Sequence, residues 1–145
     1  MSIVRANPYG AYNFLVEIDS VVSAGFSEVE GLGIEIAYID YRNGNEPVNN
    51  VRKLPGLRKF SDVTLKRGIT GVSDLFDWLK GAAAGAVAPR NIAIILLDET
   101  RTEVLRWKLR HAQPRKWTGP HLNGAASGTV AMEELVLVHE GLEIA

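Results

Sequence analysis

NIAIILLDE, from Asn91 to Glu99, is the stretch that decides the fold class, because it is apolar at nearly every position. A strand with apolar side chains on both faces must be covered on both, so this stretch predicts a buried, central β-strand. EVLRWKLRHA, from Glu103 to Ala112, alternates instead. A period of two places Leu105, Trp107 and Leu109 on one face and Arg106, Lys108 and Arg110 on the other. The cationic face is expected to meet water or a partner.

Strand patterns continue outward in both directions from this pair. AYNFLVEI places Tyr12, Phe14, Val16 and Ile18 on one face of a first strand. VVSAGFSEVEGL and IEIAYIDYR, separated by the break at Gly31 and Gly33, indicate a meander. TVAMEELVLVHEGLEI is predicted to close the chain as a strand, with Val130, Met132, Val136 and Val138 on one face.

One helix is predicted within VSDLFDWLKG, between the strand patterns. Ser73 is expected as its N-cap, and acidic residues in the first turn suit the helix dipole. Leu75, Phe76 and Leu79 form an apolar stripe expected to pack against the sheet, and Gly81 is expected to end the helix. The predicted fold is therefore mainly β: an antiparallel β-sandwich or barrel with one flanking α-helix and a long extended loop or hairpin.

Composition predicts one domain over residues 1–145, because 46% hydrophobic and 23% charged residues suit a single globular core. The net charge of −1 supplies no overall field toward nucleic acid or an anionic membrane. The absence of cysteine excludes disulfides, thiolate nucleophiles and sulfur-bound zinc. No stretch approaches the length of about 18 apolar residues that a membrane span needs, so we expect synthesis in the cytoplasm and no membrane insertion.

The candidate catalytic and cofactor-binding motifs in this sequence lack the residue spacing that such sites require. GAASG, at 124–128, lacks the register of a nucleophile elbow, and Gly31-Leu32-Gly33 lacks the third glycine of a dinucleotide site. The histidines, His111, His121 and His139, lie in separate segments without paired spacing for a metal. Glu133 and Glu134 are neighbours on a strand and should point to opposite faces. We therefore expect no catalytic, cofactor-binding or metal-binding residues.

The amino-acid sequences of several segments, and their order along the chain, resemble the tail tube family, which forms the inner tube of contractile phage tails and phage-like contractile injection systems. These segments are AGFSEVEGL, IDYRNG, KLPGLRKFSDVTLKRG, VSDLFDWLKG, IAIILLDE, RWKLRHAQPRKWTGPHLNG and VAMEELVLVHEGLEI. The resemblance extends from Asn13 to Leu142, and the polar Gln113 before Pro114 departs from the hydrophobic or aromatic residue usual there.

The resemblance implies an assembly. Six copies would form a ring, and rings would stack into a hollow tube with a sheath protein outside it. Baseplate or tube-initiator proteins would join one end, and DNA or effector proteins would pass through the lumen. The resemblance leaves open whether the particle is a phage or an injection system, and whether this chain is the main tube subunit or an initiator.

The segment from Arg42 to Lys59 is predicted to join successive rings, because loops longer than about 12–15 residues in compact domains are usually functional or disordered. Its cations could meet carboxylates on a neighbour, and its apolar residues could anchor the contact. The predicted stacking residues are Arg42, Asn43, Glu46, Asn50, Arg52, Lys53, Leu54, Pro55, Leu57, Arg58 and Lys59. The alternative for this segment is a solvated, mobile loop.

The alternative for the whole chain is a monomeric small β-barrel that binds a ligand in its mouth. In that case Trp107, Trp117 and Tyr41 would line the pocket.

Overall fold

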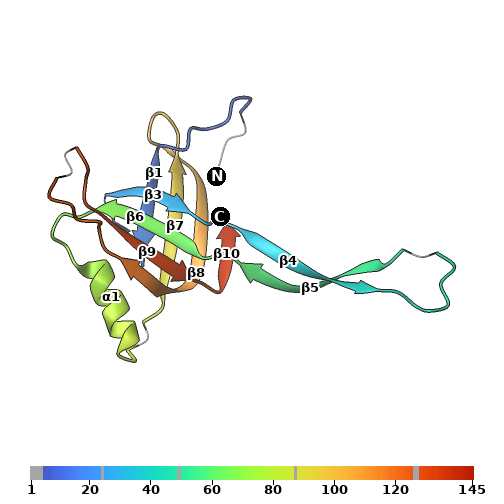
Figure 1. Ribbon diagram of the computed structural model, residues 1–145. Helices are drawn as coiled ribbons and strands as arrows, with labels where there is room; N and C mark the ends of the chain where they lie inside the picture. The colour runs from blue at the N-terminus through green and yellow to red at the C-terminus, as the bar shows by residue number, and fades with distance from the viewer. Residues whose placement is uncertain (1–4, 24, 49, 87, 126–127) are drawn as a thin grey trace.

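The computed structural model describes every residue except 1–4, 24, 49, 87 and 126–127. A β-sandwich body carries a helix on one side, and a two-stranded hairpin projects away from it (Figure 1). In chain order the elements are β1 (Phe14–Ile18), β2 (Val21–Ser23), β3 (Phe26–Glu30), β4 (Ile34–Tyr41), β5 (Arg52–Phe60), β6 (Val63–Gly68), α1 (Asp74–Ala83), β7 (Arg90–Leu97), β8 (Glu103–Thr118), β9 (Met132–Val138) and β10 (Gly141–Ile144). The antiparallel β-sandwich with one flanking helix is confirmed.

Strand β7 is central, as its apolar run predicts. It pairs with β1 on one side and with β8 on the other. Ile92 and Ile94 belong to the main core, whereas Ala93, Ile95 and Leu97 are buried on the opposite face. Strand β7 is apolar on both faces, and both of its faces are buried in the fold, as such a strand requires.

Strand β8 is longer than the sequence pattern predicts and links the two layers of the sandwich. Its first part pairs with β7 and β10, and its last part, from Gln113 to Thr118, pairs with β9. His111, with a φ of 51°, lies where the strand turns between the layers. The alternating pattern ends at Ala112, whereas pairing with the distant β9 extends the strand from Gln113 to Thr118.

The core lies between the two layers and under the helix. Strand order in the main sheet is β2-β1-β7-β8-β9-β6-β3, with β10 beside β8. Fully buried side chains come from both layers and from α1: Val16, Ile92, Leu109, Val63, Leu65, Leu135, Leu137 and Leu75. This cluster is the apolar interior that holds the sheets face to face.

The predicted apolar stripe of the helix is correct only in part, because Leu75 is buried, Leu79 is half-buried and Phe76 is exposed. Leu75 and Trp78 are buried, whereas Phe76 is 42% exposed and touches Trp117 only edge-on, with ring centroids 5.1 Å apart. Trp78 is the missed residue, and its indole N–H donates to the carbonyl of Ala88 at 2.9 Å. The helix runs past Gly81 to Ala83, because nothing at this glycine redirects the chain.

Two predicted strand faces also need correction. Tyr12 and Val130 are exposed, at 71% and 70%, rather than part of the buried faces. In β9 the buried face consists of Glu133, Leu135 and Leu137, and the predicted face is only half-buried. The alternation of apolar and polar residues in β9 predicts the wrong buried face, because a charged residue, Glu133, occupies a buried position opposite Arg67.

Candidate assembly interface

The projecting hairpin is formed by β4 and β5 with a turn over residues 42–51. Of the two predicted forms, a long extended loop or a hairpin, the structure has the hairpin, because residues 52–59 form a strand paired with β4. The register shifts between Ile36 and Tyr38, where Ala37 lies opposite the two residues Gly56 and Leu57. A Cβ at Gly56 would lie 2.9 Å from the carbonyl oxygen of Ala37, so only glycine allows the two strands to approach at this bulge.

Both faces of this hairpin expose apolar side chains. Register places Ile36 and Tyr38 on one face and Ile39 and Leu54 on the other, and each is at least 43% exposed. Leu57, at the bulge, is 86% exposed. A long, two-faced apolar ribbon is an aggregation hazard for an isolated chain, and in natural proteins such surfaces mark contacts with partners.

The tip of the hairpin is organised by its own polar contacts. Arg42 donates to the carbonyl oxygens of Glu46 at 2.8 Å and Val48 at 3.1 Å. Arg52 pairs with the Glu46 carboxylate at 2.7 Å, and Lys53 pairs with Asp40 across the strands. These predicted stacking cations are therefore already engaged within their own chain.

The other predicted stacking residues are more accessible. Arg58 and Lys59 are exposed and form no ion pair within the described part of the chain. Leu54, Pro55 and Leu57 are also exposed. All the predicted residues thus lie on one projecting element: Arg42, Asn43, Glu46, Asn50, Arg52, Lys53, Leu54, Pro55, Leu57, Arg58 and Lys59.

The root of the hairpin is held against the body at the β9–β10 corner. Nε2 of His139 lies 3.0 Å from the carbonyl oxygen of Ser61, and its ring lies 5.5 Å from the Phe60 ring. The Ser61 amide donates to the Gly33 carbonyl at 3.2 Å. Gly31, at φ 97°, passes so close to Asp62 that no side chain would fit. The hairpin therefore leaves the body at a defined root.

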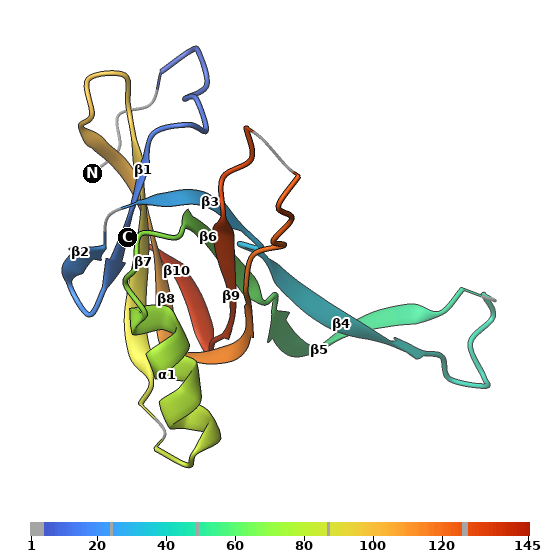
Figure 2. The same cartoon turned by 60° about the vertical axis from the view of Figure 1, so that its left-hand side comes forward.

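Sheet edges form a second kind of assembly surface. Strands β2 and β3 end the main sheet, and among the described residues each pairs on one side only. Strand β3 leads directly into β4, so its open edge continues along the hairpin (Figure 2). Unpaired strand edges are the usual template for pairing with another chain.

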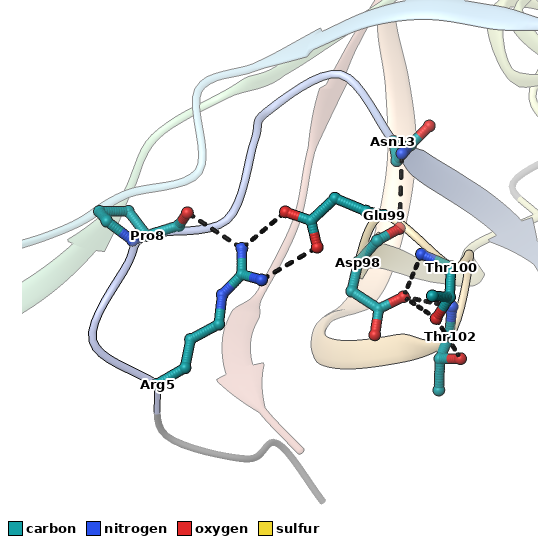
Figure 3. Close-up of polar contacts among 7 residues, drawn as sticks. All are labelled: Arg5, Pro8, Asn13, Asp98, Glu99, Thr100 and Thr102. Carbon is teal, nitrogen blue, oxygen red and sulfur yellow. Dashed lines mark hydrogen bonds and ion pairs between the residues drawn. The ribbon is translucent and has the colours of Figure 1, made fainter.

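The N-terminal arm is fastened to the turn between β7 and β8, a contact that the sequence patterns do not predict (Figure 3). Two guanidinium nitrogens of Arg5 each lie 2.9 Å from the Glu99 carboxylate, and one donates to the Pro8 carbonyl. The hydrogen bond from Arg5 lowers the pKa of Glu99. The bidentate pair defines where the arm lies.

The turn itself is closed by Asp98. Its carboxylate accepts hydrogen bonds from the amides of Thr100 and Thr102, both at 2.9 Å, and from the Thr100 hydroxyl. The Thr102 amide, followed by the Thr100 hydroxyl, lowers the pKa of Asp98. The DETRT sequence is a recognisable signal for such a side-chain-closed turn.

A buried ion pair ties the helix to the sheet. Arg67 on β6 and Glu133 on β9 are 7% and 4% exposed and pair directly across the strands. Arg67 also pairs with Asp74 at the start of α1, and the Trp117 indole N–H donates to Glu133 at 3.2 Å. Glu133 is buried and Glu134 half-exposed, which confirms the predicted opposite orientations. These groups hold the fold together rather than face a substrate.

The pocket predicted for a ligand-binding module is not assembled. Trp107 and Trp117 pack against the core cluster, whereas Tyr41 lies at the far end of the hairpin. Among the described residues, no group of three or more His, Cys, Asp or Glu side chains could hold a metal. In the same part of the chain, no helix is long and apolar enough to cross a membrane.

Comparison with protein families shows a match over most of the chain. Residues 10–143 match the family described as "T4-like virus tail tube protein gp19". A comparison with proteins of curated function found no match.

Solved structures similar to this chain include two from an extracellular contractile injection system. One belongs to an extracellular contractile injection system, the PVC sheath/tube terminator in the extended state; it is 28% identical with a TM-score of 0.86, and the match covers 98% of this chain and 99% of that one. Another, from the PVC sheath-tube complex, is 28% identical with a TM-score of 0.84, covering 95% and 91%. Hcp1 from Flavobacterium johnsoniae shares the fold at 9% identity, with a TM-score of 0.57 and coverage of 92% and 94%.

Proposed function

This chain belongs to the T4-like virus tail tube protein family, and from that membership we propose that it is the repeating subunit of the inner tube of a contractile phage tail or injection system. Residues 1–145 act as a single tail-tube domain, six copies close into a ring, and rings stack into a hollow tube. The observation that carries this proposal is the β4–β5 hairpin, which exposes apolar side chains on both faces.

Ring closure uses the open sheet edges. An antiparallel sheet that ends in unpaired strands can continue into a neighbouring copy, with each backbone hydrogen bond contributing about 0.5–1.5 kcal/mol net. In a closed ring of six copies, one edge of each copy pairs with a different edge of its neighbour. The open edges of β2 and β10, each paired on one side only among the described residues, support this arrangement.

Ring stacking uses the hairpin. One surface of a ring must meet a different surface of the next, and such a contact does not close, so it builds a filament. The projecting position of the hairpin and its exposed Leu54 and Leu57 support this role. The stacking residues are those predicted from the sequence between Arg42 and Lys59.

The partners follow from the tube. The two PVC structures are described as sheath-tube and sheath/tube terminator complexes, which supports a sheath protein around this tube and a terminator protein at one end. Baseplate or tube-initiator proteins join the other end. DNA or effector proteins pass through the lumen. The subunit is structural: it binds no cofactor and catalyses no reaction.

Negative-stain electron microscopy and size-exclusion chromatography of the purified chain test the proposal. Wild-type protein should form rings and rods as its concentration rises. Replacing residues 43–51 by a short Gly-Ser linker removes the hairpin tip but leaves the sandwich strands, so rings should survive while tubes shorten.

Three outcomes would contradict parts of this proposal. A wild-type chain that stays monomeric at every concentration would reject the tube function. A linker variant that grows tubes of wild-type length would remove the hairpin tip from the axial joint. A linker variant that yields only monomers would show that the tip serves ring closure instead.

A further inference from the structure

Two exposed strands carry opposite charge and lack a partner on one side. Strand β5 contains four cations and no acid, whereas β3 contains Glu28 and Glu30 and no cation. Among the described residues, β5 pairs only with β4, and β3 pairs only with β6. We propose that the basic β5 edge of one copy contacts the acidic β3 edge of a copy in the next ring. This inference rests on the proposed tube function.

The β5 side of the contact has two cations available. Arg52 and Lys53, near the tip, are engaged with Glu46 and Asp40. Arg58 and Lys59, near the root, are exposed and have no ion-pair partner within the described residues. Two adjacent strand residues point to opposite faces, so these cations can meet carboxylates on either face of a neighbouring strand.

The β3 side offers two carboxylates. Phe26 and Val29 pack toward the core, and Glu28 and Glu30 remain exposed. Glu28 approaches Lys66 at 3.6 Å with half of its side chain exposed, and Glu30 forms no ion pair among the described residues. Both groups can accept a second cation from outside the chain.

Acidic and basic strands already lie side by side within one copy of the chain. The acidic strands β3 and β4 lie beside the basic strands β6 and β5: Glu28 meets Lys66, Asp40 meets Lys53, and Glu35 lies opposite Lys59. Opposite charges on neighbouring strands attract, and like charges directly opposite repel. A second copy would repeat the same arrangement on the outer sides of β3 and β5. Because the two edges differ, the contact joins copies head to tail.

Side chains rather than backbone groups dominate this contact. Pro55 has no N–H to offer a neighbouring strand, so it interrupts any backbone pairing along the middle of β5. Arg58 and Lys59 lie beyond the bulge, on the body side of this proline. The contact is therefore sensitive to charge and to salt.

Paired charge reversals test the assignment in the full-length chain. The first variant, E28K/E30K, makes both edges basic, and the second, R58E/K59E, makes both edges acidic. Each variant alone should form rings but lose tubes, because every contact between rings becomes repulsive. Raising the salt from about 0.1 M to about 1 M shortens the Debye length from about 10 Å to about 3 Å and should partly restore tubes.

Mixing distinguishes a specific contact from a folding defect. In a mixture of the two variants, each acidic edge can meet a basic one, so tubes should return. The fourfold variant E28K/E30K/R58E/K59E restores complementarity within one protein and should also form tubes. K80E/K116E, a reversal of two exposed charges outside both edges, should leave tubes unchanged.

The outcomes separate this inference from the tube function. If the wild type forms tubes and either single-edge variant also forms them normally, the β3–β5 contact is wrong and the tube function stands. If the variants lose tubes but neither the mixture nor the fourfold variant recovers them, the two edges do not meet. Variants that yield only monomers would place this contact within the ring and overturn its assignment between rings. A wild type without rings or tubes would reject the tube function itself.

Discussion

His139 lies beside the carbonyl oxygen of Ser61, with Nε2 at 3.0 Å, and thereby joins the β9–β10 corner to the root of the projecting hairpin. Its other ring nitrogen lies 3.1 Å from the carbonyl oxygen of Gly141. The imidazole thus spans two segments that are distant in sequence. The hairpin leaves the body at this point, so the direction of the hairpin depends on it.

Replacing His139 by Phe should loosen the hairpin root. Phenylalanine keeps a ring beside Phe60 but removes the imidazole nitrogens that contact the Ser61 and Gly141 carbonyls, with an expected loss of about 0.5–1.5 kcal/mol. Hydrogen exchange of the amides at 33–36 and 58–61 should become faster, whereas exchange in β7 should not change. Unchanged exchange at the root would mean that another contact orients the hairpin.

Replacing Arg67 by Met should destabilise the subunit strongly. Glu133 would remain buried without its partner, and breaking a buried pair in this way costs about 3–5 kcal/mol. The double variant R67M/E133L removes both charges and should recover much of the loss. Urea unfolding of the monomer measures both, and equal losses for the single and double variants would contradict a paired role.

The two aromatic residues of α1 should differ in their effect on stability. Trp78→Ala empties a buried site and should cost about 3–5 kcal/mol. Phe76→Ala removes mainly an edge contact with Trp117, worth about 0.5–1.5 kcal/mol beyond its partly exposed area. Thermal unfolding of both variants provides the comparison, and equal midpoints would show that the helix packs through another stripe.

Stability should fall in acid. Burial tends to raise the pKa of Asp74, but the hydrogen bond and charge of Arg67 outweigh it and lower that pKa. The pKa values of Asp98 and Glu99 are also lowered, by the Thr102 amide and by Arg5. A carboxylate with a lowered folded-state pKa stabilises the fold above its unfolded-state pKa, about 3.9–4.3, and loses that contribution as pH falls.

Thermal midpoints should therefore change little between about pH 7 and pH 5 and drop below about pH 4. Asp74→Asn should lower the midpoint at neutral pH and reduce the drop in acid, because one linked proton is removed. An Asp74→Asn variant with the same acid slope as the wild type would show that other carboxylates control the effect.

Much of the strand content could be predicted from the sequence because local patterns report it. NIAIILLDE has apolar side chains on both faces, and β7 is covered on both. The turn-rich stretch after Tyr41 marks the hairpin tip. Strand β5 was missed because both of its faces meet solvent, so no alternation distinguishes RKLPGLRKF from a loop.

In the candidate interface, too, some properties follow from the sequence alone and others depend on the tertiary structure. The sequence alone determined that the body is an antiparallel β-structure with one helix and that the cations near Lys53 stand outside the core. Only the tertiary structure decided which strands have open edges, that Trp78 rather than Phe76 packs under the helix, and that Glu133 is buried. The physical reason is that these properties depend on partners far away in the chain. Glu133 can be buried because folding brings Arg67 beside it, and β3 is an edge because no described strand pairs with its outer side.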